Sequence, residues 1–188
     1  GLNMYENLPF WFEMFTARNF EVVLSPESTR SLYIKGQQTI PSDTVCYPAK
    51  LLHGHITALL EEKVDAIFYP CMSYNFDEGM SATHYNCPVV AYYPDLLNVN
   101  IPALSQVRYI HDNIGIHRPK DFEKKGAELL GREFGVPKRE AMAAIRRGYA
   151  AYDEFRQLVR TKGEEYIRYA RENGRKILVV AVRPYHMD

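Results

Sequence analysis

The stretch Val64-Asp65-Ala66-Ile67-Phe68-Tyr69, followed by Pro70-Cys71, decides which fold class the sequence predicts. It is a short and almost continuous apolar run that ends at a proline, which is typical of a buried strand in a parallel sheet. The segment before it, 48–63, places apolar residues at three- and four-residue steps and so predicts a helix with one apolar face. A helix followed by such a strand is the repeating unit of an α/β fold.

Three further apolar segments predict strands, and they are Glu21–Ser25, Cys87–Tyr93 and Lys176–Arg183. Helices are predicted, from apolar periodicity and from proline or glycine at the ends, over residues 4–18, 28–38, 48–63, 119–135 and 137–173. The alternation predicts an α/β fold class, a Rossmann-like parallel sheet with flanking helices. A long C-terminal helix then leads into a truncated second α/β unit.

The predicted domains follow this division of the chain. Residues 1–117 form an α/β domain that carries all three cysteines, 118–175 a helical segment, and 176–188 the first strand of the truncated unit. The chain begins with Gly1 and stops soon after its last predicted strand, so we expect it to be a piece of a longer protein. An unbroken helix over 137–173 would span roughly 55 Å. We expect it to leave apolar surface exposed.

The net charge of the 188 residues is zero, with 23 basic and 23 acidic side chains, but the charges are unevenly distributed. Residues 1–117 hold 6 basic and 12 acidic side chains, a net −6, whereas 118–188 hold 17 and 11, a net +6. Either two surfaces of one fold attract each other, or the basic part meets a phosphate or an acidic partner. The zero total argues against a dedicated nucleic-acid or membrane-surface binder. Since the sequence shows neither a membrane span nor a signal peptide, we expect a cytoplasmic location.

The three cysteines, Cys46, Cys71 and Cys87, are the strongest chemical signal in the sequence. Their spacing forms no Cys-x-x-Cys pair, which excludes a zinc ribbon or a thioredoxin-type motif. Cys46 begins a predicted helix, Cys71 follows a predicted strand, and Cys87 opens another. In an open α/β sheet the ends of strands and the beginnings of helices share one edge, where ligands bind, so we expect Cys46 and Cys71 to converge there. Cys87 can join them if the loop 72–86 folds back. Thiolates without histidine point to an iron–sulfur centre or, less often, to zinc, while the alternative is three ordinary small core residues.

Four blocks of the sequence together resemble one known family. The blocks are Ile40-Pro41-Ser42-Asp43-Thr44-Val45-Cys46-Tyr47-Pro48-Ala49-Lys50, Phe68-Tyr69-Pro70-Cys71, Asn86-Cys87-Pro88-Val89-Val90-Ala91-Tyr92-Tyr93-Pro94 and Arg183-Pro184-Tyr185-His186. They resemble the uncharacterised domain of large acyl-CoA dehydratase activase-related proteins. That domain is a relative of the D-component subunits of 2-hydroxyglutaryl-CoA dehydratase.

The resemblance implies a [4Fe–4S] cluster, and carried over to this chain its ligands would be Cys46, Cys71 and Cys87. In the related dehydratases the cluster takes one electron from an ATP-driven activase and uses it in the radical dehydration of a 2-hydroxyacyl-CoA. The implied partners are the remainder of a longer chain, including ATPase activase domains, and acyl-CoA. The chain itself has neither a Walker A motif nor a G-x-G-x-x-G motif, so we expect no ATP or dinucleotide binding by this part.

Several polar residues near the cysteines or at the end of the last strand are candidates to line the site. They are Ser42, Lys50, Ser73, His84, Arg183 and His186. The first hypothesis is thus an iron–sulfur domain for electron transfer. The second is a non-catalytic interaction module with structural cysteines, and the third is a zinc site made by the three thiolates with His84.

Overall fold

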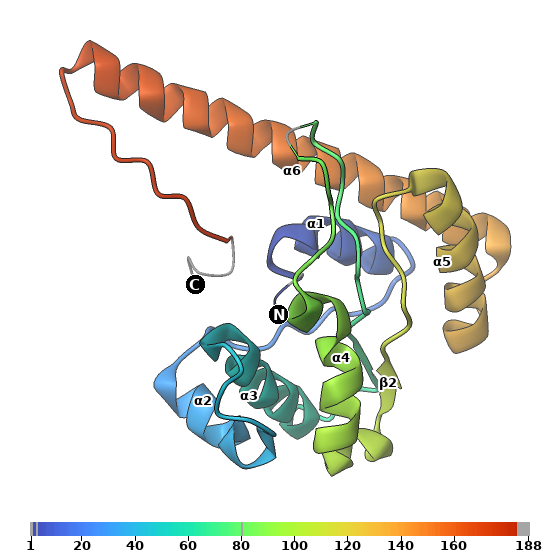
Figure 1. Cartoon of the computed structure of the whole chain (residues 1–188). Coiled ribbons are helices and arrows are strands. Elements are labelled where there is room, and N and C mark those ends of the chain that lie inside the picture. Colours follow the sequence, from blue (N-terminus) through green and yellow to red (C-terminus); the bar gives the residue numbers. More distant parts are fainter. Residues whose placement is uncertain (1, 3, 80, 184–188) are drawn as a thin grey trace.

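The computed structural model describes residue 2, residues 4–79 and residues 81–183, and it is rich in helices (Figure 1). The α-helices are α1 (Met4–Thr16), α2 (Arg30–Gly36), α3 (Tyr47–Glu61), α4 (Pro88–Asn100), α5 (Pro119–Phe134) and α6 (Lys138–Glu172). Two short 3-10 helices are Gln37–Thr39 and Pro102–Gln106. The strands are β1 (Ala66–Phe68) and β2 (Arg108–Ile110).

The two strands form a small parallel sheet, with Ile67 opposite Tyr109 in the register. An isolated bridge between Cys71 and Asn113 extends the pairing beyond the strands. The prediction of a strand ending at Tyr69 is therefore confirmed, whereas β2 was missed because three residues are too few to show a period. The structure is a mixed, helix-rich fold with a two-stranded parallel sheet, and within the described residues the full Rossmann-like sheet is not formed.

The prediction of a strand over Cys87–Tyr93 is wrong, because this segment is the beginning of α4. Pro88 lies at the first helical position, where its fixed φ suits a helix and its missing N–H costs nothing. A short apolar run cannot distinguish a buried strand from a buried helix by periodicity, and here the run continues to Asn100 as a helix.

The other two predicted strands are extended but unpaired within the described part of the chain. Glu21–Ser25 links α1 to α2 with Leu24 55% exposed. The segment 176–183 turns back after α6 and is not buried in this structure, with Leu178 88% exposed (Figure 1). Its apolar pattern predicts burial, but no element of residues 4–79 and 81–183 covers it. Residues 184–188, the remainder of the predicted second unit, lie outside the described residues.

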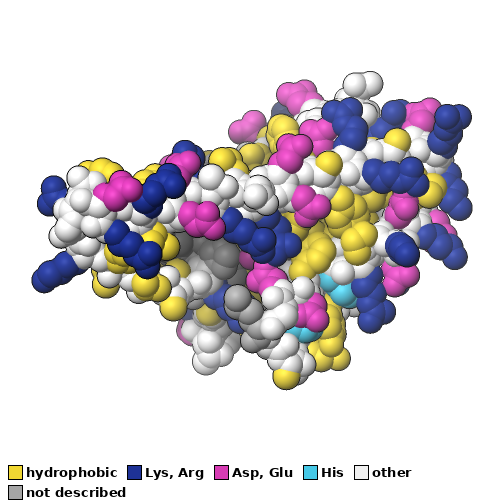
Figure 2. All heavy atoms as spheres, turned by 90° about the horizontal axis from the view of Figure 1, so that it is seen from above, with side chains coloured by type: hydrophobic (Ala, Val, Ile, Leu, Met, Phe, Trp, Pro, Cys, Tyr) yellow, Lys and Arg dark blue, Asp and Glu magenta, His cyan; other side chains and the backbone are white. Residues whose placement is uncertain are grey.

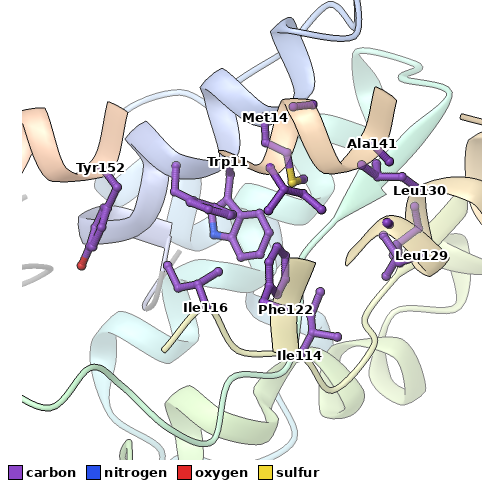
Figure 3. Packing of buried hydrophobic residues seen from close by; sticks show 14 of the residues in the cluster. Trp11, Met14, Ile114, Ile116, Phe122, Leu129, Leu130, Ala141 and Tyr152 are labelled. Atoms are coloured by element: carbon purple, nitrogen blue, oxygen red, sulfur yellow. The ribbon is translucent and has the colours of Figure 1, made fainter. Parts of the chain in front are cut away.

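Side chains of β1 alternate between two hydrophobic cores, as the pleat of a strand requires. Phe68 packs into the first core, in which Trp11 and Met14 of α1 meet Phe122 of α5 and Ala141 of α6 (Figure 3). Ile67 packs into the second core, which joins it to α3 and α4. The small sheet is therefore covered on both faces, which explains why β1 reads as an unbroken apolar run.

The long helix α6 is half packed and half exposed. Its first four turns bury residues such as Ile145 and Tyr152 against α1 and α5, and Gly148 lets α6 come close to α1, since an added Cβ would lie 2.8 Å from the Phe10 carbonyl oxygen. Beyond Tyr152 the helix projects past the core, as expected from its length (Figure 1). Figure 2 shows charged side chains along it, with hydrophobic ones exposed between them. The exposed apolar residues of this outer half are Phe155, Leu158, Val159, Tyr166, Ile167 and Tyr169.

Ion pairs join the acidic first part of the chain to the basic second part. Arg132 of α5 lies 2.7 Å from Asp112, and Arg156 of α6 pairs with Glu78. Some of the opposite charges of the two parts of the sequence therefore pair with each other within the fold, so that two of its surfaces attract each other. Among the described residues, no helix is both long enough and apolar enough to cross a bilayer.

Candidate functional site

Cys46 and Cys87 occupy equivalent positions, each at the N-cap of a helix that begins with an early proline. The Cys46 carbonyl accepts from the amide of Lys50 at 3.2 Å, and the Cys87 carbonyl accepts from Ala91 at 2.9 Å. Neither side chain caps its own helix, and both thiols are exposed. The backbone thus holds both residues firmly while their sulfur atoms remain accessible. Uncompensated N–H groups make this a favourable place for negative charge.

Cys71 is held differently, three residues beyond β1 and almost fully buried, with 1% exposure. Its amide donates to the Asp112 carbonyl at 3.1 Å, and its carbonyl accepts from Ile114 at 3.0 Å, so parallel pairing fixes its backbone. Burial raises the pKa of the Cys71 thiol to about 11, and the nearby Asp95 carboxylate on α4 adds to the increase. The Cys71 thiol is therefore held in its protonated form at neutral pH.

Cys71 follows a strand and Cys46 precedes a helix, as the sequence predicts, whereas Cys87 precedes helix α4 and not the predicted strand. As they stand, however, they do not form a metal site. No three histidine, cysteine, aspartate or glutamate side chains of the described residues are grouped so that they could hold a metal ion. In the type of donor, the three thiols match an iron–sulfur centre.

The loop before α3 holds two of the expected lining residues. The Ser42 hydroxyl accepts from the Thr44 amide at 3.2 Å and is exposed, so it shapes the turn that leads to Cys46. Lys50, one turn into α3, donates to the Asp43 carbonyl at 2.8 Å. Both residues therefore organise the approach to Cys46, and the Lys50 ammonium is directed at this loop.

Ser73 and His84 lie on a hairpin that carries the chain from Cys71 to Cys87. The hairpin is paired by an antiparallel bridge between Tyr74 and Tyr85, and the Asn75 amide donates to the His84 carbonyl at 2.9 Å. The His84 ring lies 3.4 Å from the carboxylate of Asp77, which is also on the hairpin. The loop does fold back to bring Cys87 towards Cys71, but by pairing with itself.

The remaining two candidates lie at the end of the chain. Arg183 is exposed at the end of the extended segment after α6, and His186 lies outside the described residues.

A family model, that of the CoA enzyme activase uncharacterised domain (DUF2229), matches residues 1–188. The chain belongs to this family. The match covers the whole chain and confirms the activase-related resemblance that the cysteine-containing blocks indicate. No curated protein and no solved structure matches.

In this activase-family domain, a buried chain of hydrogen bonds through Thr39, His53 and Tyr93 connects the helices that begin at Cys46 and Cys87. We call it the His53–Tyr93 relay, and the sequence did not point to it. His53 of α3 is 0% exposed, with its Nδ1 2.7 Å from the Thr39 hydroxyl and its Nε2 3.0 Å from the Tyr93 hydroxyl of α4. Because the Thr39 hydroxyl already donates to the Gly36 carbonyl, it accepts from Nδ1–H. His53 Nε2 therefore accepts from Tyr93, which fixes the tautomer of His53.

The electrostatics of the family domain keep this relay neutral. Burial lowers the pKa of His53 to about 4. Burial, followed by the charge of a Cys46 thiolate, raises the pKa of Tyr93 to about 12.

A second pair of hydrogen-bonded polar side chains lies near Cys71, where the Asp95 carboxylate of α4 is 2.7 Å from the ring of His111, just after β2. The sequence did not point to Asp95 and His111 because neither lies in a recognisable motif, and only the packing of α4 beside β2 brings Asp95 to the thiol.

Proposed function

We propose that this domain binds a [4Fe–4S] cluster through Cys46, Cys71 and Cys87 and serves electron transfer in dehydration chemistry of the 2-hydroxyacyl-CoA type. The observation that carries the proposal is the placement of two accessible thiols at helix N-caps and of a third thiol just after a strand. Membership of the CoA enzyme activase family supports it. When bound, the cluster would supply a one-electron carrier with one iron open to a further ligand.

Ligation requires a change at Cys71. Its thiol would lose its proton and turn from Asp95 and the core, whereas Cys46 and Cys87 already face solvent. The hairpin over 73–86 connects Cys71 to Cys87, so movement of this hairpin is the simplest way to bring the thiols together. The His53–Tyr93 relay would meanwhile hold α3 and α4 in place.

Anaerobic reconstitution with iron and sulfide tests the proposal. The expected result is about four irons per chain and an electron paramagnetic resonance signal after reduction. Cys46→Ala, Cys71→Ala and Cys87→Ala should each reduce the bound iron and change the signal, while the control Ser105→Ala, at an exposed residue outside the cysteine loops, keeps both. Stoichiometric zinc in place of iron would favour the zinc site with His84. Absence of iron after anaerobic reconstitution would contradict the cluster.

The second candidate function is a non-catalytic interaction module, and the exposed outer half of α6 favours it. Leu158 and Val159 are each 54% exposed, and the apolar residues of 177–182 are also uncovered. The partner would be the remainder of a longer chain, including ATPase activase domains. If this candidate is correct, a separately produced activase domain should bind the chain, and Leu158→Gln with Val159→Gln should weaken that binding at least tenfold. A matched pair of exposed changes on α5, Lys124→Gln with Lys125→Gln, should have no effect on it.

A further inference from the structure

A pocket of about 430 Å³ lies between β1, α3, the start of α1 and the extended segment 23–27. The segment runs from α1 to α2 past α3 (Figure 1). The apolar walls include Leu8, Val23, Leu52, Ile56, Ile67 and Phe68, and none of the three cysteines lines the pocket. Its size and apolar walls are those of a small-molecule site.

Two polar side chains that line the pocket, His55 of α3 and Ser25, lie in contact with each other. The Ser25 hydroxyl lies 2.9 Å from His55 Nδ1, and the Ser28 hydroxyl lies 3.1 Å from His55 Nε2. A neutral imidazole has one donor and one acceptor nitrogen. Whichever tautomer is present, Ser25 keeps hydrogen-bonding capacity beyond its bond to His55, either as a donor or as an acceptor. Ser25 lines the pocket and can therefore pair with a ligand's hydroxyl or carbonyl group.

The charge at the pocket selects against anions. Glu27 lines the pocket, and no lysine or arginine is found among the described residues of its wall. A carboxylate ligand would meet the Glu27 charge without a compensating cation, whereas a neutral polar end would not. In addition, Val23 is 43% exposed and Leu24 55% exposed at the wall, so a ligand would cover apolar surface that now faces water.

We propose that this pocket binds an uncharged amphipathic small molecule, with an aliphatic body against the apolar walls and a single hydroxyl or carbonyl end at Ser25. The site is separate from the thiols and does not depend on the proposed cluster. The chemistry specifies an aliphatic alcohol, amide or ester.

Titration of the full chain with 1-octanol, followed by calorimetry or by NMR of the pocket methyl groups, tests the proposal. We expect saturable binding of 1-octanol and roughly fivefold weaker binding of octanoate, since a like charge in high dielectric costs about 1 kcal/mol. Glu27→Gln should bring the two affinities to within twofold. Absence of saturable 1-octanol binding up to its solubility limit would overturn the proposal.

Two variants locate the ligand. Val23→Trp fills the pocket from an exposed position and should lower the affinity for 1-octanol at least tenfold, whereas the matched exposed change Leu158→Trp on α6 should leave it within twofold. Ser25→Ala should weaken the binding of 1-octanol about fivefold, which is the effect of losing one hydrogen bond. The same variant should not weaken the binding of 1-chlorooctane, because this molecule lacks the hydroxyl group. Equal affinities in Val23→Trp and Leu158→Trp would place the ligand elsewhere and contradict the assignment.

Discussion

At the scale of single residues, the three thiols differ sharply in accessibility, and this difference can be measured directly. Cys46 and Cys87 are exposed, while Cys71 is 1% exposed and has a pKa raised by burial to about 11. In the native protein at pH 8 we expect two cysteines to react rapidly with iodoacetamide and Cys71 to react at least a hundredfold more slowly. Mass spectrometry of quenched samples gives the rates. All three should react alike in urea, and fast native labelling of Cys71 would contradict its burial.

The hydrogen bond from Tyr93 to His53 makes a second prediction at this scale. Tyr93→Phe leaves the buried His53 Nε2 without its donor, so we expect the free energy of unfolding to fall by about 1–3 kcal/mol. Urea denaturation measures the change. Tyr92→Phe is the matched control, because Tyr92 is 52% exposed and its change should stay within about 0.5 kcal/mol.

His53 also makes stability depend on pH. Its pKa is lowered from 6.5 to about 4, so between these values the unfolded chain binds a proton that the folded chain does not. The stabilising effect of neutral His53 is therefore complete above pH 6.5 and is lost as the pH falls towards 4, by at most about 1.4 kcal/mol per pH unit. Urea midpoints measured from pH 7 to 4.5 should show this slope. His53→Gln should flatten it, and an unchanged slope in that variant would contradict the assignment.

At the scale of elements, α2 and α3 cross so closely that two glycines are required. An added Cβ at Gly54 would collide with the Leu32 carbonyl oxygen, and one at Gly36 with the backbone at Gly54. Gly54→Ala should lower the free energy of unfolding by about 1–3 kcal/mol, as overpacking usually does. Gly163→Ala on α6 meets open space and should raise helix stability by up to about 1 kcal/mol. Thermal melts of the two variants should move in opposite directions.

The helices could be predicted from the sequence and the sheet largely could not. Helices α1, α3, α5 and α6 were predicted to within about two residues, because each is long, and a Pro or Gly marks at least one end of α3, α5 and α6. Strands need partners, and whether 21–25 or 176–183 finds one depends on packing that no local pattern contains. The Cys87 segment was mistaken for a strand because its apolar run is shorter than the helix it begins.

The candidate site could be predicted in part. Positions at the ends of elements follow from the order of helices and strands, so the locations of Cys46 and Cys71 were foreseeable. The direction of a side chain is not foreseeable in this way, since the contact of Cys71 with Asp95 depends on how α4 packs beside β2. The family match settles the family of the chain and leaves the ligands of the site as a proposal.

At the scale of the whole molecule, the two halves of α6 should respond differently to polar substitutions. Ile145 is fully buried between α1 and α5, so Ile145→Gln should lower the free energy of unfolding by more than 3 kcal/mol or prevent folding. Leu158→Gln, on the outer half, should change it by less than about 0.5 kcal/mol. Circular dichroism melts give both values. A large loss in Leu158→Gln would show that the outer half is covered in solution.

The chain contains a single tryptophan, and Trp11 lies in the core, 1% exposed, with its ring 4.8 Å from those of Phe10 and Phe68 and 5.7 Å from that of Phe122. Intrinsic fluorescence of this protein therefore reports one location, the junction of α1, β1 and α5. The Trp11 emission will change on global unfolding, but it will not change when only the outer half of α6 frays. Comparing fluorescence with helical circular dichroism in the same denaturation series will thus separate loss of the core from loss of the projecting helix, without any added label.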